Sequence, residues 1–205
     1  MSYAKIKKEL STGIMTVYKA VFISGLVILS FGGGMLVGEL GIVPRVYYRF
    51  NQPVYNPPPE TTEISSTKLL LTINQKRNDK GLDPFKENLT LSYIAYLRAK
   101  AIVDTQEFTH VATISGLTDT RIADKLGYFY QNLRENLAID YKTEDQIVKA
   151  WERSEKHAEN IFTGEALDAG IYSLSGDFFG KNKVVTVLIL GRNRYQRGPE
   201  SEVCY

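Results

Sequence analysis

The chain has 205 residues, which suits one domain of ordinary size with additional segments and leaves little room for a second full domain. Apolar residues make up 43% and charged residues 23%, values that exclude a wholly disordered chain and a polytopic membrane protein. The formal net charge of +2 gives no indication of a nucleic-acid partner, and the single cysteine, Cys204, excludes an intrachain disulfide.

The N-terminal part contains a candidate membrane anchor. Residues 20–37 carry no charge and have about the length that a helix needs to cross the hydrocarbon layer. Four lysines precede this segment, at Lys5, Lys7, Lys8 and Lys19. By the positive-inside rule we predict a cytoplasmic N-terminus over 1–19, a transmembrane helix over 20–40 and an extracytoplasmic remainder. A cleaved signal peptide is the alternative, and it would leave the domain secreted.

The segment after the anchor is rich in proline. Pro53 and Pro57 to Pro59 favour extended polyproline II structure, so we expect 41–64 to be a juxtamembrane segment and semi-rigid spacer. At the other end, residues 193–205 are expected to be a polar tail. The folded domain is therefore predicted over 65–192.

Within the domain the periodicity changes from helical to strand-like. Apolar residues at helical spacing predict helices over 67–78 and 91–105, and Thr143 followed by Gln146 predicts the start of a third helix that runs through Trp151. The β-rich runs 168–175 and 184–190 predict an antiparallel pair. Helices followed by a hairpin indicate the α+β class.

The two histidines of the chain, His110 and His157, are both in this predicted domain. Each is expected near the C-terminal end of a helix, where the helix dipole favours a protonated ring. A structural role in capping the last carbonyl groups is therefore one interpretation of both residues.

A set of motifs over 71–172 resembles the CAP superfamily, whose members are also called SCP or cysteine-rich secretory protein domains. The run 133–138, LRENLA, is similar to the family's G-E-N-I-A signature. The other matching parts, in the family's order, are the opening motif over 71–84, the second helix over 91–101, the F-x-H element over 108–110, the bacterial W-x-x-S-x-x-H-x-x-N-I pattern over 151–161 and the start of a strand over 169–172.

The resemblance implies a three-layer α-β-α sandwich in which His110, Glu135 and His157 converge on a central cleft. In such a cleft the two imidazoles could bind a divalent metal ion such as zinc, with Glu135 completing or orienting the site. Where the family has a second glutamate, three residues after the tryptophan, this chain has Ser154. That departure removes one candidate acid/base group.

Three classes of function stay open. The first is a membrane-anchored domain that binds a lipid, cell-wall or protein ligand through the cleft. The second is a metal-assisted hydrolase or peptidase in which Glu135 is the general base, and the third is a structural or adhesion module. In the third case His110 and His157 would hydrogen-bond Glu135 as a polar seam of the sandwich.

Overall fold

The computed structural model describes residues 55–194, which form one compact unit, Tyr55–Arg194. Its helices are α4 (Ser66–Asn78), α5 (Leu89–Thr105), α6 (Asp119–Leu126), α7 (Glu144–Arg153) and α8 (Glu155–Ile161). Its strands are β1 (Lys86–Glu87), β2 (Tyr130–Ile139), β3 (Asp168–Phe178) and β4 (Lys181–Asn193). The mixture of helices and one sheet confirms the α+β class.

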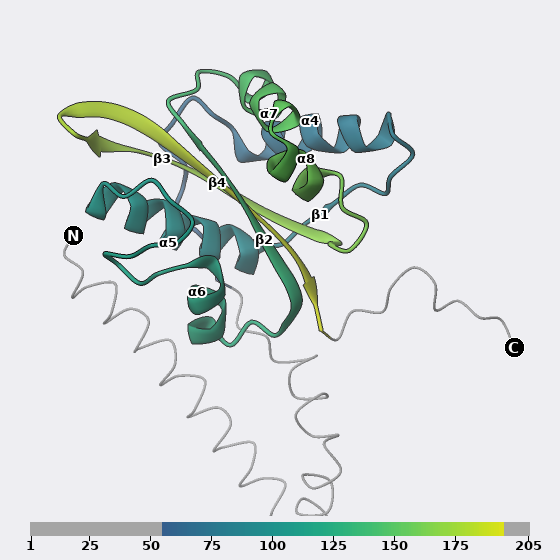
Figure 1. The fold of residues 1–205 in the computed structure, drawn as a ribbon, viewed down its shortest axis with the longest axis horizontal. Coiled ribbons are helices and arrows are strands. Elements are labelled where there is room, and N and C mark those ends of the chain that lie inside the picture. Colours follow the sequence, from purple (N-terminus) through teal and green to yellow (C-terminus); the bar gives the residue numbers. More distant parts are fainter. Residues whose placement is uncertain (1–54, 195–205) are drawn as a thin grey trace, which may run out of the picture. The chain divides into compact units, whose positions relative to one another are not determined.

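The four strands form one sheet in the order β1-β3-β4-β2. The short β1 pairs parallel with β3, and the long strands β3, β4 and β2 pair antiparallel. Helix α5 packs on β3 and β4 with α6 beside it, whereas α4, α7 and α8 lie on the other side of the sheet (Figure 1). The domain therefore has three layers, with the sheet in the middle.

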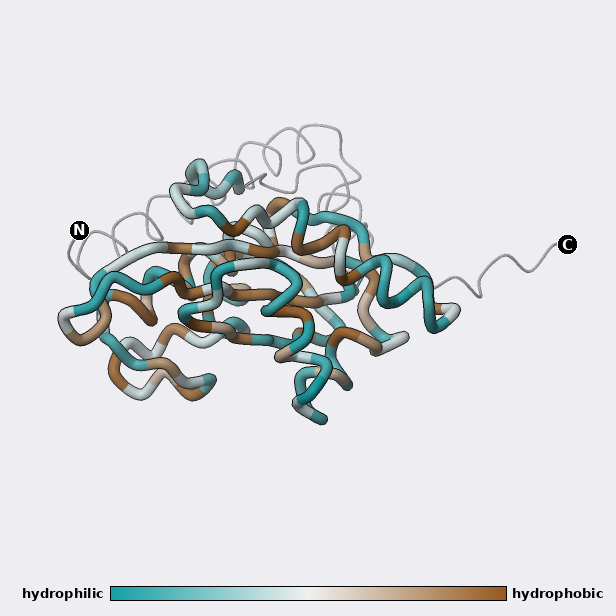
Figure 2. Tube along the Cα trace, turned by 90° about the horizontal axis from the view of Figure 1, so that it is seen from above, coloured by the Kyte–Doolittle hydropathy of each residue, from teal (hydrophilic) through white to brown (hydrophobic). Residues whose placement is uncertain are grey.

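The core lies between the sheet and the helices. A cluster of buried side chains joins α4 (Leu69, Ile73), α7 (Val148, Trp151) and β4 (Leu188, Leu190). The indole Nε1 of Trp151 donates to the carbonyl oxygen of Leu137 at 3.0 Å, which satisfies its one polar atom. Figure 2 shows hydrophobic stretches recurring along the central elements, while several projecting loops are hydrophilic.

The helix starts follow the capping chemistry of the sequence. Ser65, Asn88 and Thr143 each accept a hydrogen bond from a backbone amide in the first turn of α4, α5 and α7. The predicted helices over 67–78 and 91–105 are confirmed with slightly earlier starts. The hairpin is also confirmed, with longer strands than expected.

Both histidines lie elsewhere than expected relative to the helix ends. Helix α7 ends at Arg153, and a new helix begins after Ser154, so His157 lies in the first turn of α8 instead of at the end of α7. Helix α5 ends at Thr105 and is capped by Gln106 in the left-handed conformation, so His110 lies in the loop beyond that cap. Neither histidine caps a helix C-terminus, so that interpretation is wrong.

Part of the proline-rich segment packs against the domain. Ile64 is buried, the Glu60 carboxylate accepts from the backbone amides of Ser66 at 3.0 Å and Ser173 at 3.2 Å, and the Tyr55 ring stacks on Tyr93. Residues 55–64 are therefore part of the compact unit, which starts earlier than the predicted 65. The predicted anchor over 20–40, the rest of the spacer and most of the polar tail lie outside the described residues. Within 55–194, no helix is both long and apolar enough for a membrane span.

Candidate functional site

Arg98 and Glu135 form a buried ion pair between α5 and the sheet. The Nε atom of Arg98 lies 2.8 Å from Oε2 of Glu135, and the two side chains are 1% and 6% exposed. The carbonyl oxygen of Thr109 accepts a further hydrogen bond from Nη2 of Arg98. Because a charge-assisted contact of this kind is costly to break when it is buried, the pair fixes Glu135 in place.

His110 is hydrogen-bonded to the second oxygen of the same carboxylate. Its Nδ1 atom lies 2.7 Å from Oε1 of Glu135, whereas the imidazole side chain is 54% exposed. An ionised carboxylate only accepts hydrogen bonds, so Nδ1 carries the proton and Nε2 is the ring atom left for other partners. Glu135 therefore acts as a buried support that orients a surface histidine.

His157 lies next to His110, while both oxygens of Glu135 are bonded to other residues. The centroids of the two imidazole rings are 6.1 Å apart, with the ring planes tilted by 53°. Partial burial lowers the pKa of His157 below its ordinary value, and the charge of His110 lowers it further. Of the expected polar seam, the described residues show only the contact between His110 and Glu135.

Asn136, the next residue on β2, contacts the helix layer on the other face of the sheet. The amide of Asn136, which is fully buried, donates to the carbonyl oxygen of His157 at 3.0 Å, and Asn160 donates to Oδ1 of Asn136 at 2.8 Å. Because successive side chains of a strand point to opposite faces, Glu135 faces α5 while Asn136 faces α8. Strand β2 thus positions both histidines, one through each face.

Asp119 is a further acidic residue beside this group. It is the first residue of α6, and burial raises the pKa of its carboxyl, with the negative charge of Glu135 adding to the effect. Sequence reasoning missed Asp119 because it does not predict α6. Sequence reasoning also places Arg98 on a face of the predicted helix without a partner. A guanidinium on the mostly apolar, buried side of α5 is a signal for a buried carboxylate partner.

The loop that carries His110 is held by an internal carboxylate. Glu107 accepts from the backbone amides of Thr113 and Ile114, both at 2.8 Å, and also from the Thr113 hydroxyl. These hydrogen bonds lower the pKa of Glu107, and the bond from the Thr113 hydroxyl has the largest effect. The same loop leaves two apolar side chains in solvent, since Val111 is 67% and Ile114 is 69% exposed.

The donor set does not fit a catalytic metal centre. Such a zinc site has three protein ligands, yet residues 55–194 contain no group of three or more His, Cys, Asp or Glu side chains that could hold a metal ion. The two imidazoles are the remaining pair, because both oxygens of Glu135 are already engaged. Ser154, which stands in place of the family's second glutamate, ends α7 and starts α8, and its side chain makes no capping hydrogen bond to α8.

Comparisons with known proteins agree with this fold. The model of the cysteine-rich secretory protein family, CAP, matches residues 70–188. A curated relative, the uncharacterized protein YkwD of Bacillus subtilis (strain 168), is 29% identical over 122 residues, which are 59% of this chain and 47% of YkwD. The chain therefore spans about half the length of this relative.

Two solved structures share the fold at low sequence identity. An outer surface protein from Borrelia burgdorferi superposes with a TM-score of 0.56 at 23% identity, covering 62% of this chain and 92% of that one. An extracellular protein with an SCP domain from Bacillus anthracis str. Ames gives a TM-score of 0.50 at 18% identity, covering 60% and 39%. With the family model matching more than half of the residues, the chain belongs to the cysteine-rich secretory protein (CAP) family.

Proposed function

We propose that this CAP domain binds a ligand at the surface formed by His110, Val111 and Ile114, without turning the ligand over. This proposal rests on the contacts of Glu135, because one of its carboxylate oxygens is bonded to Arg98 at 2.8 Å and the other to His110 at 2.7 Å. A preorganised side chain with a fixed hydrogen-bonding atom gains affinity because little freedom is lost on binding. Glu135 supplies that preorganisation to His110.

The same geometry favours binding over hydrolysis. A general base must reach the proton that it removes, but Glu135 is buried and would have to give up one of its two donors to accept a proton from water. The described residues contain no cysteine, and Cys204 lies outside them. Over 55–194, an enzyme of this kind therefore lacks an available base at Glu135 as well as a nucleophile in a recognisable motif.

The exposed side chains indicate the chemistry of the ligand. With Nδ1 bonded to Glu135, the Nε2 atom of His110 is left for a ligand, as an acceptor in the neutral ring and as a donor in the protonated ring, while Val111 and Ile114 offer exposed apolar surface on the same loop. A lipid, cell-wall or protein ligand that combines a hydrogen-bonding group with an apolar segment would match this arrangement. The rigid loop closed by Glu107 keeps the apolar side chains in position.

Retention by cell-envelope fractions tests the proposal. The full chain would be mixed separately with vesicles of extracted lipid, with purified cell wall and with solubilised envelope proteins, and the bound share measured after sedimentation or capture. We expect one fraction to retain the chain and His110→Ala or Val111→Ser/Ile114→Ser to reduce retention. Phe179→Ser is the matched control, because Phe179 is 73% exposed at the tip of the β3–β4 hairpin.

Retention that is unchanged in the first two variants, or lost equally in the Phe179→Ser control, would contradict the proposed surface. Since all variants carry the same N-terminal segment, any difference among them in the lipid arm arises from the domain.

A divalent ion on His110 and His157 stays a prediction of the resemblance. The side chains present allow a metal site with two imidazole ligands, in which water or a bound ligand would fill the remaining coordination positions. Elemental analysis of the purified chain tests this, and we expect bound zinc to fall with His110→Ala and with His157→Ala. A metal content that is zero or unchanged would remove the metal from the account.

We also propose that the domain is held outside the cytoplasm by the segment 20–40. The uncharged run and the lysines before it support this orientation. The descriptions of two similar structures, an outer surface protein and an extracellular protein, agree with an extracytoplasmic location.

A further inference from the structure

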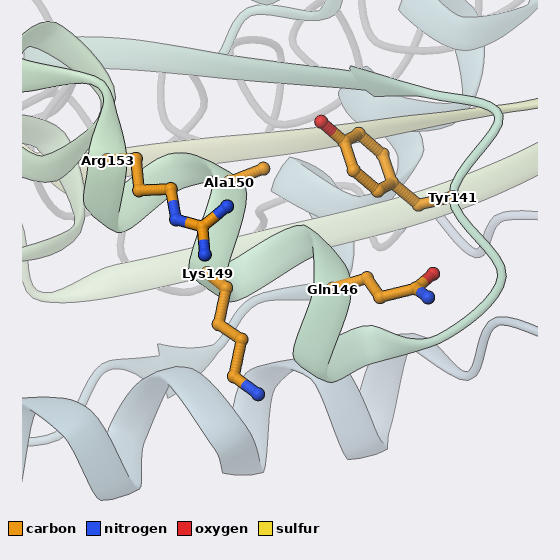
Figure 3. A pocket seen from close by; sticks show the side chains of 5 residues that line it. All are labelled: Tyr141, Gln146, Lys149, Ala150 and Arg153. Atoms are coloured by element: carbon orange, nitrogen blue, oxygen red, sulfur yellow. The ribbon is translucent and has the colours of Figure 1, made fainter.

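A second candidate site lies along α7, among residues that the site around Glu135 does not use. A cavity of about 440 Å³ is lined by Tyr141 from the turn after β2 and by residues of α7, namely Gln146, Lys149, Ala150 and Arg153 (Figure 3). The α7 residues follow the i, i+3, i+4 and i+7 spacing, so they share one face of the helix. The volume lies in the range of small-molecule sites.

Two cations on this face form no ion pair within residues 55–194. Lys149 and Arg153 are exposed, and no carboxylate of that range pairs with either side chain. Nearby cations are compensated, since Lys142 pairs with Asp140 at 3.3 Å and Lys76 with Glu152 at 3.8 Å. In the compact unit, the cavity is therefore lined by two positive side chains that have no ion-pair partner there.

The other lining groups add hydrogen-bond donors. The Oε1 atom of Gln146 accepts from the backbone amide of Lys142 at 3.0 Å, which leaves the amide nitrogen of Gln146 as its group for a ligand. The Tyr141 ring packs against the core cluster, and its hydroxyl can donate. In Figure 3, Tyr141 and Arg153 lie at opposite ends with Ala150 between them.

We propose that this pocket binds a phosphate ester, with the phosphate held by Arg153 and Lys149 and the organic part placed against Tyr141. A phosphate monoester carries up to two negative charges and three acceptor oxygens, which match two cations and the neighbouring donors. The planar guanidinium of Arg153 offers a two-pronged contact, and the flexible stem of Lys149 supplies a mobile charge. A cavity of this size exceeds the needs of inorganic phosphate alone.

Backbone amide shifts of the full-length chain in nonionic detergent, selectively ¹⁵N-labelled at tyrosine, lysine and alanine, test this site. Glycerol 3-phosphate should shift the amides of Tyr141, Lys149 and Ala150 in a saturable way, and inorganic phosphate and glycerate should bind more weakly. The double variant Lys149→Gln/Arg153→Gln should weaken binding by about tenfold or more, because two charge-assisted contacts are lost. Lys125→Gln, an exposed cation of α6 without an ion pair among the described residues, should bind as the unaltered chain does.

Vesicles that contain phosphatidic acid, used in place of glycerol 3-phosphate, show whether a lipid headgroup also enters the pocket. Binding to vesicles that falls in the double variant assigns the site to lipid, and binding of the soluble ester alone assigns it to a soluble or polymeric ester. Absence of saturable shifts with either probe, equal binding of glycerate, or equal binding by the double variant would overturn the proposal.

Discussion

Arg98 determines more of the candidate site than any other single residue. Its side chain is 1% exposed, and its guanidinium holds Glu135 and also donates to the carbonyl oxygen of Thr109, directly before His110. One side chain thus fixes both the carboxylate and the loop that carries the histidine. A buried charge is stable only when its partners remain in place, so the site and the stability of α5 on the sheet are coupled.

Removal of the Arg98 cation should lower the stability of the domain. Arg98→Met removes the buried guanidinium from Glu135 and leaves the carboxylate only its contact with the half-exposed His110, and we expect the free energy of unfolding to fall by about 3–5 kcal/mol in urea titrations. Arg98→Met/Glu135→Gln should recover part of that loss, because no unpaired charge remains. A loss below about 1 kcal/mol in the single variant would mean that the pair does not support the fold.

The motif resemblance predicts the two histidines and the glutamate of this site, but it does not predict the residues that hold them in place. His110 and Glu135 lie together as the resemblance implies, and the ring of His157 lies close to that of His110. Arg98 lies within the matched second helix, but the resemblance gives it no role, and Asp119 lies outside the matched parts. The contact between Arg98 and Glu135 spans 37 positions in the chain. No local pattern encodes a contact of that length.

At the scale of elements, the approach of α5 to the sheet depends on Gly170. A Cβ atom at this position of β3 would lie 2.1 Å from the backbone carbon of Leu91 and 2.1 Å from the nitrogen of Ser92. Both contacts are with backbone, which cannot rotate away. The first turn of α5 therefore lies directly against β3, and this contact helps to place Arg98 over Glu135.

A methyl group at this position should destabilise the domain strongly. We expect Gly170→Ala to lower the free energy of unfolding by about 3 kcal/mol or more, as overpacking against rigid backbone does. Gly164→Ala is the control, because a Cβ there meets nothing within 4 Å, and it should change stability by less than about 0.5 kcal/mol. Similar stabilities of the two variants in thermal unfolding would contradict the described packing.

Glu144 joins α7 to the start of α4. Its carboxylate accepts from the backbone amide of Ser65 at 3.0 Å and pairs with Lys68 at 2.9 Å. Burial raises the pKa of Glu144, but the hydrogen bonds from Ser65 and Lys68 outweigh burial and bring it below the ordinary 4.5. The carboxylate form therefore stabilises the folded state above pH 4.5, and this contribution is lost as the pH falls through the lowered pKa.

Acid unfolding should reveal this contribution. Relative to the unaltered chain, Glu144→Gln should be less stable at neutral pH, and the difference should shrink as the pH falls below 4.5. Glu152→Gln removes only the partly exposed pair with Lys76 and should show a much smaller change. A difference for Glu144→Gln that stays constant from neutral to acid pH would contradict the lowered pKa.

Elements with strong local patterns were predictable, and elements with polar or short patterns were not. Helices α4 and α5 carry capping residues and buried apolar residues at helical spacing, and strand β4 of the hairpin is rich in β-branched residues. Strand β2 contains Arg134, Glu135 and Asn136, which serve the site and the α8 contacts instead of forming an apolar alternation. Helix α6 has only eight residues, but Thr118 caps its start and Gly127 ends it in the left-handed conformation, so signals for it were present and were missed.

At the scale of the whole molecule, the compact unit Tyr55–Arg194 presents His110 at its surface. The segment directly before α4 is tied down through Glu60 and Ile64, so any spacer lies further toward the N-terminus. If the segment 20–40 anchors the chain, the ligand surface stays close to the cell that makes the protein. A ligand in the cell envelope fits that geometry.

Protease treatment of intact cells tests the proposed topology. A protease added outside should remove the domain and spare an epitope tag placed at the cytoplasmic N-terminus. N-terminal sequencing of the recovered protein distinguishes a retained anchor from a cleaved signal peptide. Protection of the domain in intact cells, with digestion after lysis, would contradict the orientation.

Histidine ¹⁵N NMR of the full-length chain tests the central claim most directly, because the chain has only two histidines. In its neutral form His110 should carry its proton on Nδ1, held by Glu135, and its Nε2 signal should shift when the retained envelope fraction is added. Glu135→Gln should weaken both effects. A His110 ring protonated on Nε2, or one that does not respond to a fraction that retains the chain, would contradict the account.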